Sequence, residues 1–180
     1  MGILRRMLVV VVLSVGIALV LAAITEKKVQ DGLDHEQPAF GLGRTFHLTE
    51  QNLVDAVSTL SLSLPVGRVR LYGSELAVDL HIRSKDGVRP SDIYRDLYDL
   101  VDFALVSSRN IETLTVRVLS VEGQQRETKQ LLLAMKADRR DLGDWPEADQ
   151  AAANTKALGV YLQSRFDMTY TQTWRTLFAS

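Results

Sequence analysis

Eighteen consecutive uncharged residues near the start of the chain, 7–24, constrain its fold more than any other feature. Twelve of them are Leu, Val or Ile. At about 1.5 Å of rise per residue, a helix of this length measures roughly 27 Å, which is enough to cross the hydrocarbon core of a bilayer. On an insertion scale, this composition favours the membrane by roughly 5 kcal/mol. The run therefore predicts a transmembrane helix over 7–24.

Charges flank this run on both sides and indicate its orientation. Arg5 and Arg6 precede it, whereas Lys27 and Lys28 follow it. Basic residues before the first membrane span favour a cytoplasmic N-terminus, and the two lysines weaken this asymmetry without reversing it. We therefore expect residues 1–6 in the cytoplasm and the C-terminal domain outside, in a single-pass protein of the cell membrane.

A cleaved secretory signal is the main alternative to an uncleaved anchor. Such signals have an apolar core of about 7–15 residues, followed by small residues at positions −3 and −1 from the cut. Here the core is longer, and cleavage after Ala23 would place Leu21 at −3, whereas cleavage after Thr25 would place threonine at −1. The pattern favours the anchor over the signal, and it favours a buried helix of a soluble fold least.

Composition excludes several functional classes. Because Arg5 and Arg6 are the only charges before residue 25, the rest of the chain carries a formal charge of −3, which argues against a nucleic-acid-binding surface. The chain has no cysteine, so thiol nucleophiles, thiolate metal sites and disulfides are excluded. An exported domain without disulfides relies on its core, as in many bacterial surface proteins, and the length beyond the anchor is sufficient for one.

Beyond the anchor, the chain reads as a linker followed by one domain. Glycine, proline and charged residues without periodicity fill 25–43, which predicts the linker, and 44–180 is the extracytoplasmic α+β domain. Helical spacing of apolar residues predicts helices over 49–64, 91–107 and 146–163. Alternation of apolar and polar residues predicts strands over 68–72, 76–83, 113–120, 129–137 and 169–178. The last of these segments is also compatible with a helix.

The predicted elements form repeated helix–strand–strand units. We expect an αββ-αββ-αβ order, with an antiparallel sheet packed on the helices. In the helix over 91–107 the apolar side is wide, and Asp96, Asp99 and Asp102 lie opposite to it. This pattern predicts a central helix with an acidic outer face.

Acidic residues and histidines offer few metal ligands in a recognisable pattern. Acidic side chains recur at every third position of one charged loop, at Asp138, Asp141, Asp144 and Glu147. This spacing is not that of a calcium-binding loop, because the Asp-x-Asp-x-Asp-Gly pattern is missing. The chain has three histidines, namely His35, His47 and His81. They are not spaced as a metal-binding pair, and we predict no metal and no cofactor.

One strand face combines side chains that are used in acid–base chemistry. Asp79, His81 and Arg83 alternate with apolar residues and so share a face of the predicted strand over 76–83. Such a row is as typical of a solvated sheet as of a general acid–base group. The chain also lacks the Gly-x-Ser-x-Gly and phosphate-loop motifs. We therefore expect no enzymatic activity.

Four side chains are candidate contacts for a partner. Trp145 stands in a polar loop, where exposure is expected, and tryptophan is a frequent anchor of protein interfaces. Arg68, Arg70 and Tyr72 alternate with apolar residues, which places them on the solvent face of a predicted strand. We expect these four residues to contact a partner, and Trp174 to lie in the core.

An anchored domain without a catalytic motif is typical of a non-catalytic module. We expect a membrane-anchored extracytoplasmic interaction or assembly module of a bacterial envelope, which binds a protein partner or associates with copies of itself. The alternative is an extracytoplasmic sensor or carrier domain that binds a small ligand or a cell-wall polymer. An enzyme of unrecognised type is the third and least favoured class.

Overall fold

A computed structural model describes residues 45–83, 87–123, 128–146 and 155–178. The chain divides into two units, Met1–Ala39 and Phe40–Ser180, and the described residues all belong to the second. The predicted transmembrane run and the predicted linker lie outside the described residues. Among the helices that are described, none has both the length and the apolar character needed to span a bilayer. The anchor therefore stays a prediction from the sequence.

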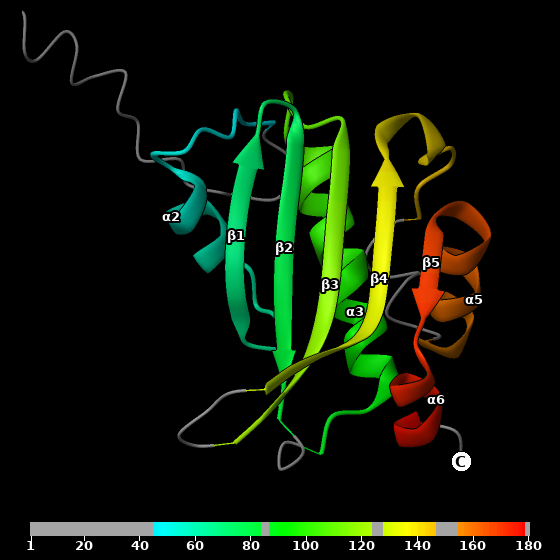
Figure 1. Cartoon of the computed structure of the whole chain (residues 1–180). Helices are drawn as coiled ribbons and strands as arrows, with labels where there is room; N and C mark the ends of the chain where they lie inside the picture. Colours follow the sequence, from blue (N-terminus) through cyan, green and yellow to red (C-terminus); the bar gives the residue numbers. More distant parts are fainter. Residues whose placement is uncertain (1–44, 84–86, 124–127, 147–154, 179–180) are drawn as a thin grey trace, which may run out of the picture. The chain divides into compact units, whose positions relative to one another are not determined.

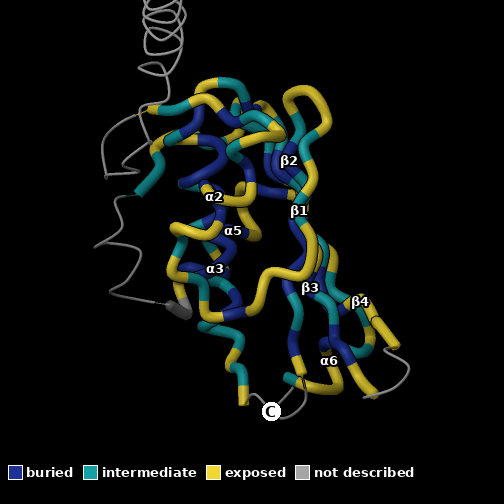
Figure 2. The backbone as a smooth tube through the Cα atoms, turned by 90° about the vertical axis from the view of Figure 1, so that its left-hand side faces the viewer, coloured by how far each residue is buried: buried dark blue, intermediate teal, exposed yellow. Residues whose placement is uncertain are grey.

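The described residues form an α+β fold in which helices pack on one face of a five-stranded sheet (Figure 1). Figure 2 shows α2, α3 and α5 on one side of the strands. The elements follow in the order α2 (Leu53–Ser58), β1 (Val66–Tyr72), β2 (Glu75–Ile82), α3 (Pro90–Val101), the π-helical turn η1 (Asp102–Ser107), β3 (Thr113–Glu122), β4 (Thr128–Asp138), the 3-10 turn η2 (Arg139–Asp141), α5 (Thr155–Arg165), β5 (Asp167–Tyr170) and α6 (Gln172–Phe178). This order agrees with the predicted helix–strand–strand units and adds α6 at the end.

The sheet is mixed, and the prediction of an antiparallel sheet is wrong at one junction. The strand order is β1-β2-β3-β4-β5, and three of the four neighbouring pairs are antiparallel. The pair β2 and β3 is parallel. The two strands are connected through α3, which carries the chain back to the end of the sheet where β2 began, and such a crossover makes neighbouring strands parallel.

Strict alternation along the two central strands separates the core from the solvent. The core side chains of these strands, which all face the helices, are Leu76, Val78, Leu80, Leu114, Val116 and Val118. The helix α3 covers them with its own buried residues, which include Ile93, Leu97 and Leu100. The intervening positions of the strands point to the opposite face of the sheet, which no described helix covers in Figure 1.

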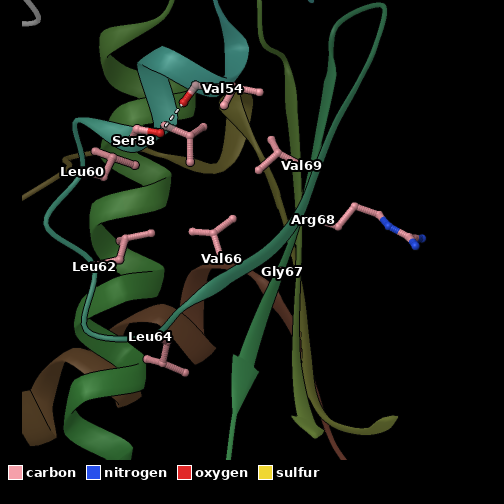
Figure 3. A pocket seen from close by; sticks show the side chains of 10 residues that line it. Val54, Ser58, Leu60, Leu62, Leu64, Val66, Gly67, Arg68 and Val69 are labelled. Atoms are coloured by element: carbon pink, nitrogen blue, oxygen red, sulfur yellow. Dashed lines mark hydrogen bonds between the residues drawn. The ribbon is translucent and has the colours of Figure 1, made fainter. Parts of the chain in front are cut away.

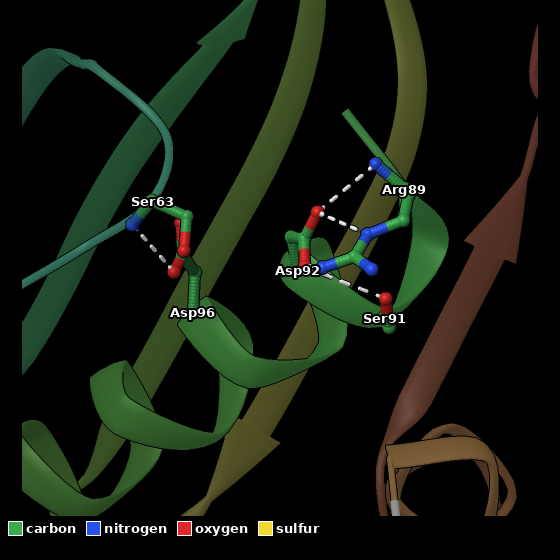
Figure 4. Close-up of polar contacts among 5 residues, drawn as sticks. All are labelled: Ser63, Arg89, Ser91, Asp92 and Asp96. Atoms are coloured by element: carbon green, nitrogen blue, oxygen red, sulfur yellow. Dashed lines mark hydrogen bonds and ion pairs between the residues drawn. The ribbon is translucent and has the colours of Figure 1, made fainter. Parts of the chain in front are cut away.

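The first helix is shorter than predicted, because a buried carboxylate holds the chain that follows it. Instead of extending over 49–64, α2 ends at Ser58. Asp96 on α3 is fully buried, and one of its carboxylate oxygens accepts the backbone N–H of Ser63 at 2.8 Å (Figure 4). The other carboxylate oxygen accepts the backbone N–H of Leu64 at 2.7 Å. The prediction of an acidic outer face on α3 is therefore wrong at Asp96, which binds the loop between α2 and β1.

A second carboxylate on α3 caps its N-terminus. Asp92 accepts the backbone N–H of Arg89 at 3.2 Å and the Arg89 guanidinium at 2.9 Å (Figure 4). This contact with a cation lowers the pKa of Asp92. Negative charge in the first turn is favourable because the N–H groups of that turn lack acceptors within the helix.

The C-terminal segment is not a single strand. Only Asp167–Tyr170 pairs with β4, and the helix α6 begins at Gln172. Thr171 at the junction accepts the backbone N–H of Trp174 through its hydroxyl oxygen, at 3.3 Å, which is an N-cap contact. The strand prediction over 169–178 is therefore wrong beyond Tyr170, whereas the prediction that Trp174 is buried is confirmed.

Candidate functional site

A shallow hollow of about 270 Å³ lies on the uncovered face of the sheet, across β1, β2 and β3. The strand register places outer-face side chains in three rows, Arg68–Asp79–Arg117, Arg70–Ala77–Thr115 and Tyr72–Glu75–Thr113. The middle row contains Ala77, whose side chain is a single methyl group. The longer side chains around it form the walls of the hollow, and Ala77 forms its floor.

A carboxylate–guanidinium pair forms one wall of the hollow. Asp79 is only 7% exposed, and its two oxygens accept hydrogen bonds from Nε of Arg117, at 2.7 Å, and from Nη2, at 2.8 Å. This bidentate contact raises the pKa of Arg117. Arg68 lies on the other side of Asp79 in the same row. Because Arg117 binds both oxygens of Asp79, the guanidinium of Arg68 has no acidic partner among the described residues.

The edge strand β1 contributes the positive charge of the hollow. Arg70 donates a hydrogen bond from Nη1 to the phenol oxygen of Tyr72 at 2.9 Å, and Tyr72 is exposed. The guanidinium of Arg70, like that of Arg68, contacts no carboxylate in the part of the chain that the structure describes. Two arginines whose charges are not compensated lie on neighbouring positions of one strand face, an arrangement that suits the binding of carboxylates or phosphates.

The opposite face of the same edge strand is apolar. A groove of about 430 Å³ lies between α2 and β1. Its aliphatic lining residues are Val54, Val57, Leu60, Leu62, Leu64, Val66 and Val69, and Ser58, Gly67 and Arg68 complete the lining. In Figure 3, Val66 and Val69 point toward this groove, whereas Arg68 points away from it. Val54 is 67% exposed and Val66 is 39% exposed, so the groove opens to solvent through aliphatic side chains. β1 therefore separates a basic surface from an apolar groove.

The structure brings together three of the four predicted contact residues. Arg68, Arg70 and Tyr72 all line the hollow. The expectation that Trp145 is exposed is wrong, because it is partly buried and packs within the domain. Its ring stacks on Tyr98, with centroids 4.8 Å apart, and its Nε1 donates to Asp102 at 3.2 Å. A contact between Trp145 and a partner stays an untested prediction.

Buried carboxylates on the helix side have raised pKa values. Burial raises the pKa of Asp96, Asp99 and Asp102, which follow one another on α3 and η1. The same effect raises the pKa of Tyr98 to about 12. Asp96 accepts two backbone N–H groups, Asp102 accepts the indole N–H of Trp145, and Asp99 lies 3.8 Å from the guanidinium of Arg95.

The other candidates from the sequence do not converge on a site. Both oxygens of Asp79 bind Arg117, and the ring of His81 lies against Gly67 of β1. Among the described residues, no three His, Asp or Glu side chains are placed to hold a metal ion. His35 and Glu147 lie outside the described residues.

The groove and the Asp79–Arg117 pair were missed by sequence reasoning. The pair depends on the parallel register of β2 and β3, for which the only local signal is the order strand, helix, strand. No protein-family model, curated protein or solved structure matches this chain. Its function is therefore inferred from the chemistry of the described residues.

Proposed function

We propose that this chain is a membrane-anchored, extracytoplasmic, non-catalytic interaction module of a bacterial envelope, and that it binds a protein partner at β1. The observation that carries the proposal is the pair of uncompensated arginines, Arg68 and Arg70, beside an open apolar groove on one edge strand. Exposed aliphatic groups and unpaired cations on one edge are typical of an interaction surface. The anchor rests on the apolar run 7–24.

Site-specific photo-crosslinking in the native membrane tests the partner. A photoreactive amino acid at Tyr72, in the full-length chain, is expected to yield a discrete adduct with another protein. The same amino acid at Arg175, an exposed position on α6, is the matched control and should yield none. The absence of any adduct at Tyr72, or equal adducts at both positions, would argue against a binding surface at β1.

Fractionation and protease accessibility test the anchor and the orientation. The full-length chain should remain with membranes after an alkaline wash, and protease added outside the cell should digest the domain. N-terminal sequencing of the mature protein should find the start of the chain intact. A mature chain that begins near residue 24, or an intact chain in the cytosol, would contradict the anchored part of the proposal.

The size of the groove favours a second candidate function, namely a carrier or sensor of a small ligand. A volume of about 430 Å³ lies in the range of small-molecule pockets, and its lining is largely aliphatic. A thermal-shift screen of the full-length chain against metabolites and cell-wall fragments tests this alternative. A ligand whose stabilising effect is lost in Val54→Asp, but kept in Arg175→Glu, would favour the carrier.

A further inference from the structure

Within the part of the chain that the structure describes, the edge strand β1 presents free backbone groups along part of its length. It is the outermost strand of the sheet, and its hairpin with β2 closes at the pair Tyr72 and Glu75. In an antiparallel ladder, hydrogen-bonded pairs alternate with pairs that are not hydrogen-bonded. Counting back from the closing pair, Arg68, Arg70 and Tyr72 direct their backbone N–H and C=O groups to β2. The backbone groups of Val69 and Leu71 therefore point outward from the sheet.

The two faces of β1 would favour different side chains on an added strand. A strand paired with β1 places alternate side chains on opposite faces. Side chains on the outer face would lie beside Arg68 and Arg70, and those on the inner face would lie beside Val69, over the groove in Figure 3. Charge complementarity requires acidic groups at the first set of positions, and the groove requires aliphatic groups at the second.

A second copy of β1 does not meet these requirements. If two β1 strands paired in antiparallel fashion across a two-fold axis, their outer faces would bring the arginines of one copy against those of the other. Like charges in facing positions of two strands are destabilising.

We infer that β1 binds an extended peptide segment of a partner protein in which carboxylate and aliphatic side chains alternate, and that this segment joins the sheet as an additional strand. Its backbone pairs with Val69 and Leu71, its carboxylates contact Arg68 and Arg70, and its aliphatic groups enter the groove between α2 and β1. Strand addition to a sheet edge is an established mode of peptide recognition. The inference rests on the proposed function and names the chemistry of the partner.

A synthetic peptide with blocked ends tests this inference directly. The probe alternates glutamate and valine over the length of β1, which is 7 residues, and the comparison peptide alternates lysine and valine. Fluorescence anisotropy measures binding of each to the full-length chain in lipid nanodiscs. The acidic peptide should bind at least about tenfold more tightly than the basic one. Equal affinities, or no binding of the acidic peptide, would overturn the inference.

Two N-methylated forms of the acidic peptide distinguish strand pairing from charge attraction alone. One carries the methyl groups on the valine nitrogens and the other on the glutamate nitrogens, so that each blocks the N–H groups of one peptide edge. Because β1 pairs with only one edge, one form should lose binding by about tenfold or more and the other should retain it. If both forms bind as well as the parent peptide, the peptide is not added as a strand.

Charge reversal on β1 provides the matched variant. Arg68→Glu should weaken binding of the acidic peptide roughly tenfold and strengthen binding of the basic one. Arg175→Glu makes the same change of charge on α6 and should alter neither. If crosslinking at Tyr72 captures a partner but no peptide binds, strand addition is wrong and the proposed interaction stands. If the peptide binds but no partner is captured, strand recognition stands and the proposed interaction in the envelope fails.

Discussion

Arg117 binds both carboxylate oxygens of Asp79, at 2.7 and 2.8 Å. This pair determines which positive charges on the outer face of the sheet remain uncompensated. Arg68, Arg70 and Arg117 all line the hollow, and without this pair none of the three would contact a carboxylate among the described residues. The pair joins β2 to β3 at the parallel junction that the crossover through α3 creates. It therefore links the topology of the sheet to the charge that remains available on β1.

Asp79→Asn should lower the free energy of unfolding by about 1 kcal/mol. A buried carboxylate bound in bidentate geometry is worth more than a neutral contact, but Arg117 is 49% exposed and water screens the interaction. Urea unfolding followed by tryptophan fluorescence measures the change, since both tryptophans belong to this domain. Glu75→Gln, which alters a bond to the neutral Thr115, is the control and should have a smaller effect. Equal stability of wild type and Asp79→Asn would contradict the prediction.

Asp96→Ala should lower the free energy of unfolding by about 2 kcal/mol. The variant leaves the N–H groups of Ser63 and Leu64 without their acceptor, and the second of these is buried. Amide hydrogen exchange should become faster at these two positions before it does so in β2. Asp99→Ala on the same helix is the control, because the Asp99 carboxylate accepts no backbone N–H in the described structure. Unchanged exchange at Ser63 and Leu64 would show that Asp96 does not hold this loop.

The stability of Asp99→Asn should depend on pH in a defined direction. Burial raises the pKa of Asp99 in the folded state, so its ionised form is less favourable in the fold than in the unfolded chain. At pH 7 wild type bears this cost and the variant does not. As the pH falls through the folded pKa toward the unfolded value of about 4, protonation removes the cost. The variant should therefore have the higher melting temperature at pH 7, with the difference vanishing below about pH 4.

Asp92→Asn is the control of opposite sign. The contact with Arg89 lowers the pKa of Asp92, so its ionised form stabilises the fold above the unfolded pKa. This variant should melt below wild type at pH 7, and the difference should shrink as the pH falls through the folded pKa. If the two variants change with pH in the same direction, the assignment of buried and paired carboxylates is wrong.

The strand faces were predictable from the sequence because their signal is local. Alternation along 68–72 placed Arg68, Arg70 and Tyr72 on one face, and the structure places all three at the hollow. Asp96 was not predictable in the same way. The position of Asp96 in the sequence suggests a solvated helix face. Nothing local shows that the backbone N–H groups of residues 32 and 33 positions away will donate hydrogen bonds to its carboxylate. The short α2, and therefore the groove beside it, follows from that distant contact.

The C-terminal segment was ambiguous for a different reason. Tyr170, Trp174 and Phe178 recur at intervals of four, a spacing that places side chains on one side of a strand and also on one side of a helix. The rings contact one another in series, with centroids 5.2 Å apart for the first two and 4.5 Å for the last two. Thr171 was the signal that favours the helix, because threonine is a preferred N-cap.

Thr171→Val should lower the free energy of unfolding by about 1–2 kcal/mol, because it removes the N-cap of α6. The variant also loses the single hydroxyl proton that the carbonyl oxygens of Leu131, at 2.8 Å, and Leu132, at 3.0 Å, share. Leu132 is the extra residue where the register of β4 shifts against β3, so this hydroxyl joins the irregular point of β4 to the start of α6.

Thr171→Ser keeps the hydroxyl and should retain most of the stability, and Thr176→Val removes a hydroxyl within α6 and should have little effect. Urea unfolding followed by tryptophan fluorescence distinguishes these variants, since Trp174 lies in α6. If Thr171→Ser is as unstable as Thr171→Val, the hydroxyl does not form this junction and the helix is held by its aromatic contacts alone.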